Sequence, residues 1–368
     1  MDQKKFISAC EEYLRIKSPS EYLNAVSEDL TKCKEIDAQE IPAQGFGKFL
    51  GRKQKVYQYK PRNYLNALLD AAGLEHEHFR SGNNDARSAL FYVGYYTACT
   101  NHDMRLAQCG LYQYIRRHAI VFGMLGNTGT DHCLQVYDAI YGLAAADTEL
   151  FAKLLPESLG LASNGHLFSC MMTNIVMGLW YKNDTILTKG LESARKLQSQ
   201  KTIPKLDKTL GRYMISLADN DAENASITLD EFCRDVNRDN EGTYNKPNGK
   251  APYMDFVCPF AHGLYNLAHY VLDEATFSQI RRPAKRFDTE YSEWLIAENF
   301  PSPRRLVDYK DEMSVMNILF DTIPEARISR PYKDDKRYYI DGTAFREEQF
   351  AMLSETIDLE QHFRQYNS

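Results

Sequence analysis

Three short polar breaks interrupt the middle of the chain, and each one separates two apolar helical stretches. The breaks read ADT, NDT and NDA, and their aspartates Asp147, Asp184 and Asp221 recur every 37 residues. This spacing is typical of helical-hairpin arrays, because a single helix pair cannot bury its apolar face alone. We therefore predict a helical-hairpin repeat array of the α-solenoid, tetratricopeptide-like kind, with 37-residue repeats and the three aspartates in equivalent turns.

Apolar residues around these breaks follow the spacing of helices rather than the alternation of strands. One helix face carries Leu134, Tyr137 and Tyr141, and similar series flank the later breaks. Strand signals are nearly absent, apart from short extended pieces at 55–59 and 337–340. The pattern therefore predicts the all-α fold class. Further helices are expected at 4–16, 20–33, 84–99, 105–125, 287–300, 309–320 and 343–364.

The length of 368 residues suits one large helical domain. We predict that residues 1–368 form this single domain in three parts. The first part, 1–125, holds N-terminal helices and a basic loop at 41–62 that is rich in glycine and proline. The hairpin repeats occupy 126–283, and C-terminal helices occupy 284–368.

Cysteine usage and hydropathy bear on the compartment in which the protein works. The eight cysteines form no CxxC pair, and most lie within apolar helical patterns, where a free thiol packs as a small hydrophobic group. The N-terminal residues lack the apolar core of a secretory signal, and the longest nearly apolar run, 168–181, is too short to span a bilayer. These features predict a cytoplasmic protein that does not associate with membranes.

The short motifs do not predict a catalytic site. The GFGKFLG run at 45–51 lacks the preceding strand and the Ser or Thr after the lysine that a phosphate-binding loop needs. His132 and Cys133 are neighbours, but neighbouring helical residues point about 100° apart, which is poor geometry for a nucleophile and its base. We therefore predict no catalytic residues and no cofactor.

Two histidine pairs are the candidate metal ligands. His76 and His78 alternate in one segment. The second pair belongs to a helical stripe made of His262, Asn266, His269 and Asp273. We expect this stripe to be the polar side of an amphipathic helix. Neither pair has a third ligand at a suitable spacing, so we predict that no metal is bound.

Negative charge is concentrated in one segment. The net charge of the chain is −6, and residues 219–242, with eight acids and two bases, account for all of it. Such a segment is either a solvated helix face or a surface that repels nucleic acid and attracts a basic partner. A loop at 241–259 follows it and supplies aromatic side chains. The candidate partner-binding residues are Asp230, Glu231, Asp235, Asp239 and Tyr244.

Four segments carry a resemblance to a known family. They are NIVMGLWYKNDTIL at 174–187, RYMISLADNDAENA at 212–225, HGLYNLAHYVLDEATF at 262–277 and SEWLIAENFPSP at 292–303. Through them the stretch 138–303 resembles the immunity protein 49 family of bacterial polymorphic-toxin loci. These positions are mostly apolar or lie in turns, so they specify fold more than activity.

The resemblance implies a non-enzymatic protein that binds a cognate toxin and neutralises it by occlusion. The acidic segment suits a basic toxin, for example a nuclease, and raises the rate of association with it. Two other classes stay open. One is a helical-repeat adaptor or regulatory protein that binds a peptide or a small ligand in its groove. The other is an α-helical enzyme that uses the histidine stripe.

Overall fold

The protein is described by a computed structural model that covers residues 1–37, 85–125, 130–236, 252–329 and 339–366. Nearly all regular structure in these ranges is helical, which confirms the predicted all-α class. The N-terminal and central helices are α1 (Gln3–Tyr13), α2 (Pro19–Asp37), α6 (Asp85–Asn101), α7 (Met104–Leu125), α8 (Gln135–Ala144), α9 (Thr148–Leu154), α10 (Leu167–Trp180), α11 (Asp184–Ser199), α12 (Lys205–Ala218) and α13 (Ala222–Asp235). The later helices are α14 (Pro259–Val271), α15 (Glu274–Phe277), α16 (Thr289–Ala297), α17 (Val315–Asp321), α18 (Gly342–Thr356) and α19 (Leu359–Tyr366). Among the described helices, none is both long enough and apolar enough to cross a bilayer.

Short elements complete the described chain. The 3-10 helices are η1 (His132–Leu134), η2 (Glu157–Leu159), η3 (Pro252–Asp255) and η4 (Asp311–Ser314). Strand β1 (Ile328–Ser329) pairs antiparallel with β2 (Tyr339–Ile340), so the described end of the extended piece predicted at 337–340 is confirmed. The basic loop predicted at 41–62, including the extended piece at 55–59, lies outside the described residues.

One turn geometry joins the two helices of a hairpin. Between α8 and α9, Ala146 has a left-handed φ of 60°, and the N–H of Asp147 donates to the carbonyl of Gly142 at 3.0 Å. This bond is typical of a Schellman motif, which pairs a carbonyl that a helix end would leave free. Asp147 then caps α9, because its side chain accepts the N–H of Leu150. Asp147 therefore pairs a free carbonyl at the end of α8 and also caps the start of α9.

The same turn precedes α11 and α13, but not in the predicted register. The caps of these helices are Asn183 and Asp221, and each follows a residue with a φ of 54°. Asp147 is therefore equivalent to Asn183, and Asp184 is the first residue of α11. The predicted equivalence of Asp184 is wrong by one residue, because an amide oxygen caps a helix as well as a carboxylate does. The caps lie 36 and then 38 residues apart rather than at one fixed period.

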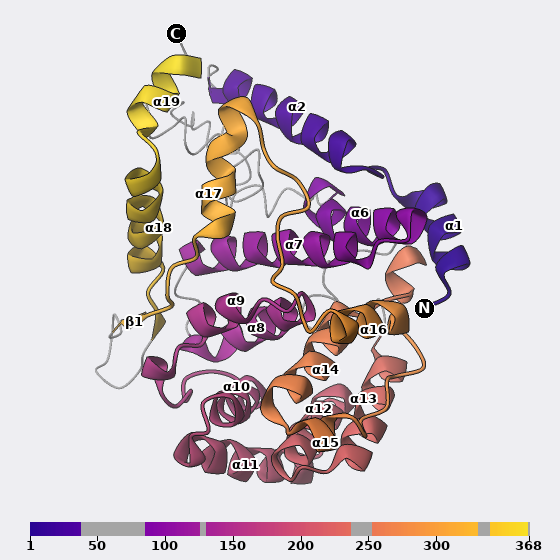
Figure 1. Cartoon of the computed structure of the whole chain (residues 1–368). Coiled ribbons are helices and arrows are strands. Elements are labelled where there is room, and N and C mark those ends of the chain that lie inside the picture. The colour runs from indigo at the N-terminus through magenta and orange to yellow at the C-terminus, as the bar shows by residue number, and fades with distance from the viewer. Residues whose placement is uncertain (38–84, 126–129, 237–251, 330–338, 367–368) are drawn as a thin grey trace, which may run out of the picture.

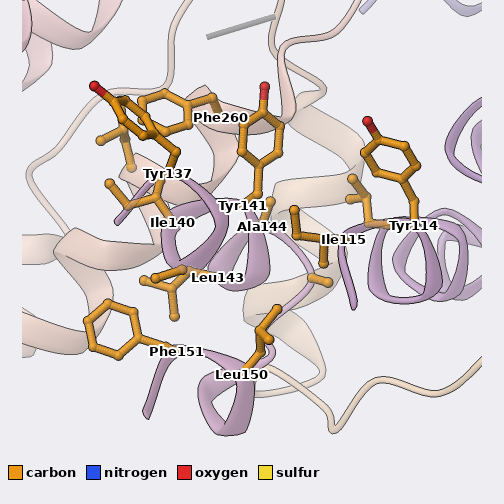
Figure 2. Packing of buried hydrophobic residues seen from close by; sticks show 14 of the residues in the cluster. Tyr114, Ile115, Tyr137, Ile140, Tyr141, Leu143, Ala144, Leu150, Phe151 and Phe260 are labelled. Carbon is orange, nitrogen blue, oxygen red and sulfur yellow. The ribbon is translucent and has the colours of Figure 1, made fainter. Parts of the chain in front are cut away.

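Helix α8 lies at the centre of the packing. All its residues are buried, and Figure 2 shows its side chains between those of α7, α9 and Phe260 of α14. Its last two carbonyls, at 143 and 144, and the carbonyl of its C-cap Ala145 are paired by side chains from three other helices. Asn266 of α14, Tyr291 of α16 and Gln108 of α7 donate to them at 2.7, 2.7 and 3.0 Å. These bonds satisfy buried acceptors and tie distant parts of the chain to α8.

Helix α14 returns to α8 instead of contacting only its neighbour in sequence. A Cβ atom on Gly263 would lie 1.9 Å from the carbonyl oxygen of Ile140, so only glycine permits this backbone approach. Stacking of each hairpin on the next does not account for this contact. The regular solenoid arrangement therefore stays a prediction, although the hairpins and their shared turn are present.

Helix α7 crosses the middle of the molecule, with α6 on one side and α8 on the other (Figure 1). The segment 301–310, which connects α16 to η4, runs along it. Gln113 of α7 holds this segment: its side-chain oxygen accepts the N–H groups of Leu306 and Val307 at 3.1 and 3.0 Å, and its amide donates to the Val307 carbonyl at 3.2 Å. The C-terminal helices α17 and α18 also pack on α7, so the described residues share one large core.

Candidate functional site

Helix α13 carries the described part of the acidic segment. Its buried face is apolar and includes Ala225, Leu229 and Phe232. Its outer face carries Glu223 and Glu231, and between them, four residues from each, is Ile227. Ile227 is 41% exposed, which makes it one of the most exposed large apolar side chains among the described residues. Ile227 is therefore an apolar position within an otherwise acidic outer helix face.

Two of the predicted partner-binding acids are paired with bases on α12. Glu231 lies 2.5 Å from Arg212, and Asp235 lies 2.8 Å from Lys205. The carboxylates are about a third exposed, at 29% and 30%, so these are surface pairs that contribute little to stability. They remain accessible to a partner, but their charge is partly neutralised within the chain. Asp239 and Tyr244 lie outside the described residues.

Asp230 has a structural role that the sequence does not reveal. Its carboxylate accepts the backbone N–H of Ala284 at 3.0 Å and lies 3.3 Å from Arg234. One turn earlier, the hydroxyl of Ser226 accepts the N–H of Arg281 at 2.9 Å. These two bonds fix the segment 280–286 along α13. Asp230 is therefore an anchor for a neighbouring segment as well as part of the acidic face.

A cavity of about 640 Å³ lies where this segment meets α14, α15 and the end of α16. Its lining includes Tyr265, His269, Glu274, Phe277, Arg282 and Phe300. The ring of His269 stacks on Phe300 with a centroid distance of 3.9 Å. Phe300 has a φ of 50°, a left-handed conformation that is strained for a bulky residue and is often found at binding sites. An aromatic wall beside Arg282 could hold a flat or apolar group that carries an anion.

The electrostatics of His269 follow from its position in this cavity. Partial burial lowers the pKa of His269, and the nearby Glu274 carboxylate acts in the opposite direction. The imidazole is therefore neutral at pH 7 and presents one donor and one acceptor to the cavity. Periodicity placed His269 on a helical stripe but could not show that α15 and α16 would enclose it.

Two other members of the predicted histidine stripe, His262 and Asn266, are buried, so the expectation of an outer polar side is wrong for them, whereas Asp273 is exposed and caps α15. His262 is fully buried, its Nε2 accepts the N–H of Asp288 at 3.0 Å, and its ring stacks on Phe287. Burial lowers the pKa of His262 to about 3. Asn266 is buried as well, and it pairs the end of α8. These two side chains face the centre of the molecule, where Nε2 of His262 and the amide of Asn266 have polar partners, while Nδ1 of His262 is buried without a hydrogen-bond partner among the described residues.

The candidate metal ligands are not brought together by the described fold. His262 and His269 belong to no group of three donors, and His76 and His78 lie outside the described residues. Among the described residues, one such group exists, and it is the unpredicted cluster of Asp131, Cys133 and Cys170. His132 is buried beside Cys133, and burial lowers the pKa of its imidazole.

Known proteins give no further guide to this surface and cavity. No family model, no curated protein and no solved structure matches the chain.

Proposed function

We propose that this chain is a non-catalytic immunity protein, which binds a basic cognate toxin in the cytoplasm and neutralises it by occlusion. The toxin partner in this proposal is implied by the resemblance of residues 138–303 to the immunity protein 49 family. The observation that carries it further is the outer face of α13, where the exposed Ile227 lies between Glu223 and Glu231. A binding face needs an apolar centre as well as charge, because charge mainly raises the rate of association.

The ion pairs on this face are compatible with such a role. Arg212 and Lys205 hold Glu231 and Asp235 in place without burying them. A basic partner can therefore replace these two bases in their ion pairs at a small cost in free energy, because surface ion pairs are weak. Residues 219–236 hold six acids and one base, so the face still attracts a basic protein at long range.

The test is growth rescue by co-expression with the protein that the neighbouring gene encodes, after that protein has been shown to stop growth when expressed alone. The wild-type chain should restore growth, and Ile227→Arg should abolish the rescue, because a cation in the apolar centre repels a basic partner. Leu161→Arg is the matched control, since Leu161 is exposed to a similar degree, 44%, on a different part of the surface. Full rescue by Ile227→Arg would remove α13 from the interface, and absence of rescue by the wild-type chain would contradict the immunity function.

The cavity favours a second candidate, a regulatory protein that binds a peptide or a small ligand. Its aromatic wall and Arg282 suit a ligand that joins an aromatic ring to a carboxylate. N-acetylphenylalanine is a suitable probe, and its binding should appear as shifted side-chain resonances of His269 and Phe300. Arg282→Gln should weaken this binding, whereas Arg195→Gln, at an exposed position of α11, should not. Unchanged spectra at millimolar probe would exclude this ligand class.

A further inference from the structure

Two cysteines form a small cluster apart from the main core. Cys133 of η1 and Cys170 of α10 pack with Ala162 in a satellite cluster that is separate from the large one. Their sulfur atoms lie within 4.8 Å of each other, and the thiol of Cys133 forms a hydrogen bond with Cys170. Both side chains are buried, with exposures of 0% and 9%. A reactive thiol pair needs this proximity, and it also needs an approach from solvent.

A surface loop at 161–166 covers the pair and is held in place by two side chains. The carboxylate of Asp131 accepts the N–H groups of Ser163 and Asn164 at 2.6 and 2.7 Å. Asn174 exchanges two hydrogen bonds with the backbone of Ala162, at 2.8 and 2.9 Å. Much of the loop is exposed, so the sulfur atoms lie only one layer below solvent.

Gly165 places the loop backbone directly against the sulfur atoms. A Cβ atom on this residue would lie 2.2 Å from the sulfur of Cys133 and 3.5 Å from that of Cys170. The Cys133 thiol also points toward the Asn164 carbonyl, with a sulfur–oxygen distance of 3.9 Å. The absence of a side chain at Gly165 therefore leaves the space that both sulfur atoms occupy.

The two thiols differ in how readily they ionise. The hydrogen bond from Cys133 lowers the pKa of Cys170, although burial acts against this, and the same bond raises the pKa of Cys133. Burial raises the pKa of Cys10, Cys99 and Cys258 above the ordinary thiol value. Within the pair, Cys170 is therefore the thiol that ionises more readily, and the thiolate is the reactive form.

We propose that Cys133 and Cys170 are a reversible redox pair, which peroxide oxidises to a disulfide beneath the loop at 161–166. The Cys170 thiolate attacks hydrogen peroxide, the O–O bond breaks, and hydroxide leaves as the sulfenic acid forms. The Cys133 sulfur then attacks the Cys170 sulfur, a disulfide bond forms, and the hydroxyl leaves as water. In total, two thiols and one peroxide give one disulfide and two waters, and the sulfurs lose two electrons.

The nearby carboxylate fits this role better than it fits a metal site. Asp131 uses one oxygen for the two loop N–H groups and the other for the N–H of Cys133 at 2.9 Å. These bonds account for most of its acceptor capacity. Among the described residues, no fourth donor joins the group, whereas a structural zinc site usually has four protein ligands. The hydrogen bonds that hold the loop account for the position of Asp131, but they do not account for the two neighbouring thiols.

Mass spectrometry of the full chain tests the pair. After brief treatment with hydrogen peroxide, a non-reducing digest should contain a peptide that joins Cys133 to Cys170, and the number of free thiols should fall by two. Dithiothreitol should reverse both changes. Cys170→Ser should prevent the loss of the two thiols, and Cys170→Ala serves if the serine variant does not fold.

The control is Cys233→Ser, because Cys233 is also buried close to another cysteine, Cys258, but its pKa is raised by burial. This variant should form the 133–170 cross-link as the wild type does. The proposal is overturned if peroxide leaves the thiol count unchanged, or if other cysteine pairs cross-link equally. It is also overturned if the purified protein holds stoichiometric zinc that protects both thiols, since the cluster would then be a metal site.

Discussion

Asp147 does more than cap a helix, because it also neutralises a buried arginine. Its carboxylate accepts two hydrogen bonds from Arg116 of α7, at 2.6 and 2.9 Å, and both side chains are only 2% exposed. Arg116 also donates to the carbonyl of Phe320 at the end of α17. One buried ion pair therefore joins the turn between α8 and α9 to the C-terminal helices. Removing one partner of such a pair is far more costly than removing a surface pair.

The replacement Asp147→Ala should lower the free energy of unfolding by about 3 kcal/mol, because it removes the buried counter-ion of Arg116 and leaves only the exposed Glu149, at 2.7 Å, as its partner. Denaturant titration followed by circular dichroism measures the loss. Asp221→Ala is the matched control, since Asp221 caps α13 in the same kind of turn, is only partly buried, and has no arginine partner among the described residues. Its loss should be much smaller. Equal losses would show that capping, and not the ion pair, is what Asp147 contributes.

The sequence pointed to Asp147 but not to Arg116. The period of the polar breaks marks the aspartate, whereas nothing in α7 distinguishes this arginine from its neighbour Arg117. In the same way, Cys133 and Cys170 lie 37 residues apart, one predicted repeat, yet periodicity alone gives no distance between their sulfur atoms. Tertiary partners of this kind depend on how helices pack, which local patterns do not encode.

At the scale of elements, the helices and their turns were largely readable from the sequence. The predicted helices at 84–99 and 105–125 correspond to α6 and α7, and the three breaks correspond to real hairpin turns. The helix expected at 343–364 is divided into α18 and α19, because Ile357 has an extended backbone that ends α18. The register of the middle turn was missed, since Asn and Asp are equivalent as caps and the pattern favoured the aspartate.

The left-handed residue in each turn gives a prediction at this scale. Lys182 is exposed and has a φ of 54°, a conformation that costs a side-chain-bearing residue about 1 kcal/mol and costs glycine almost nothing. Lys182→Gly should therefore raise the free energy of unfolding by roughly 0.5–1 kcal/mol. Lys201→Gly is the control, because Lys201 is an exposed turn residue without a positive φ.

Stability should not rise in the Lys201→Gly variant, because glycine there only makes the unfolded chain more flexible. The same increase in both variants would mean that loss of a surface charge, not relief of backbone strain, is responsible. Thermal unfolding monitored by calorimetry distinguishes the two results.

At the scale of the whole molecule, buried histidines link the packing to pH. Burial lowers the pKa of His262 to about 3, from an ordinary value of 6.5. Below pH 6.5 the unfolded chain therefore binds a proton at this position that the folded chain does not, and stability falls as the pH falls. The lowered pKa of His269 also makes the folded state less stable as the pH falls. The raised pKa of Asp288 has the opposite effect on stability, at lower pH.

Between pH 8 and pH 5, His262 alone should reduce the free energy of unfolding by about 2 kcal/mol. The measurement is the urea midpoint as a function of pH for the wild type and for His262→Gln, whose amide oxygen can still accept the N–H of Asp288. The variant should be less sensitive to pH over this range, whatever its stability at pH 8. Parallel curves for the two proteins would assign the acid sensitivity to other groups.

The overall arrangement was the part that the sequence described least well. A period in the chain suggests stacking of neighbours, but Gly263 allows α14 to return to α8, and His262 and Asn266 of the histidine stripe are buried as a result. The outer face of α13 was found by its charge, and Ile227 could have been found as an apolar residue on the polar side of that helix. The cavity depends on α14, α15 and α16 together, so no local pattern predicts it.

The pairing of the α8 carbonyls has a consequence for the order of events on the ribosome. The hydroxyl that pairs with the Ala144 carbonyl belongs to Tyr291, 147 residues later in the chain. At ordinary rates of translation, about 5–20 residues per second, α8 emerges on the order of ten seconds before its last partners do. During that interval its end stays hydrated and its apolar faces stay partly uncovered. The end of α8 therefore reaches its final pairing only after α16 has been made.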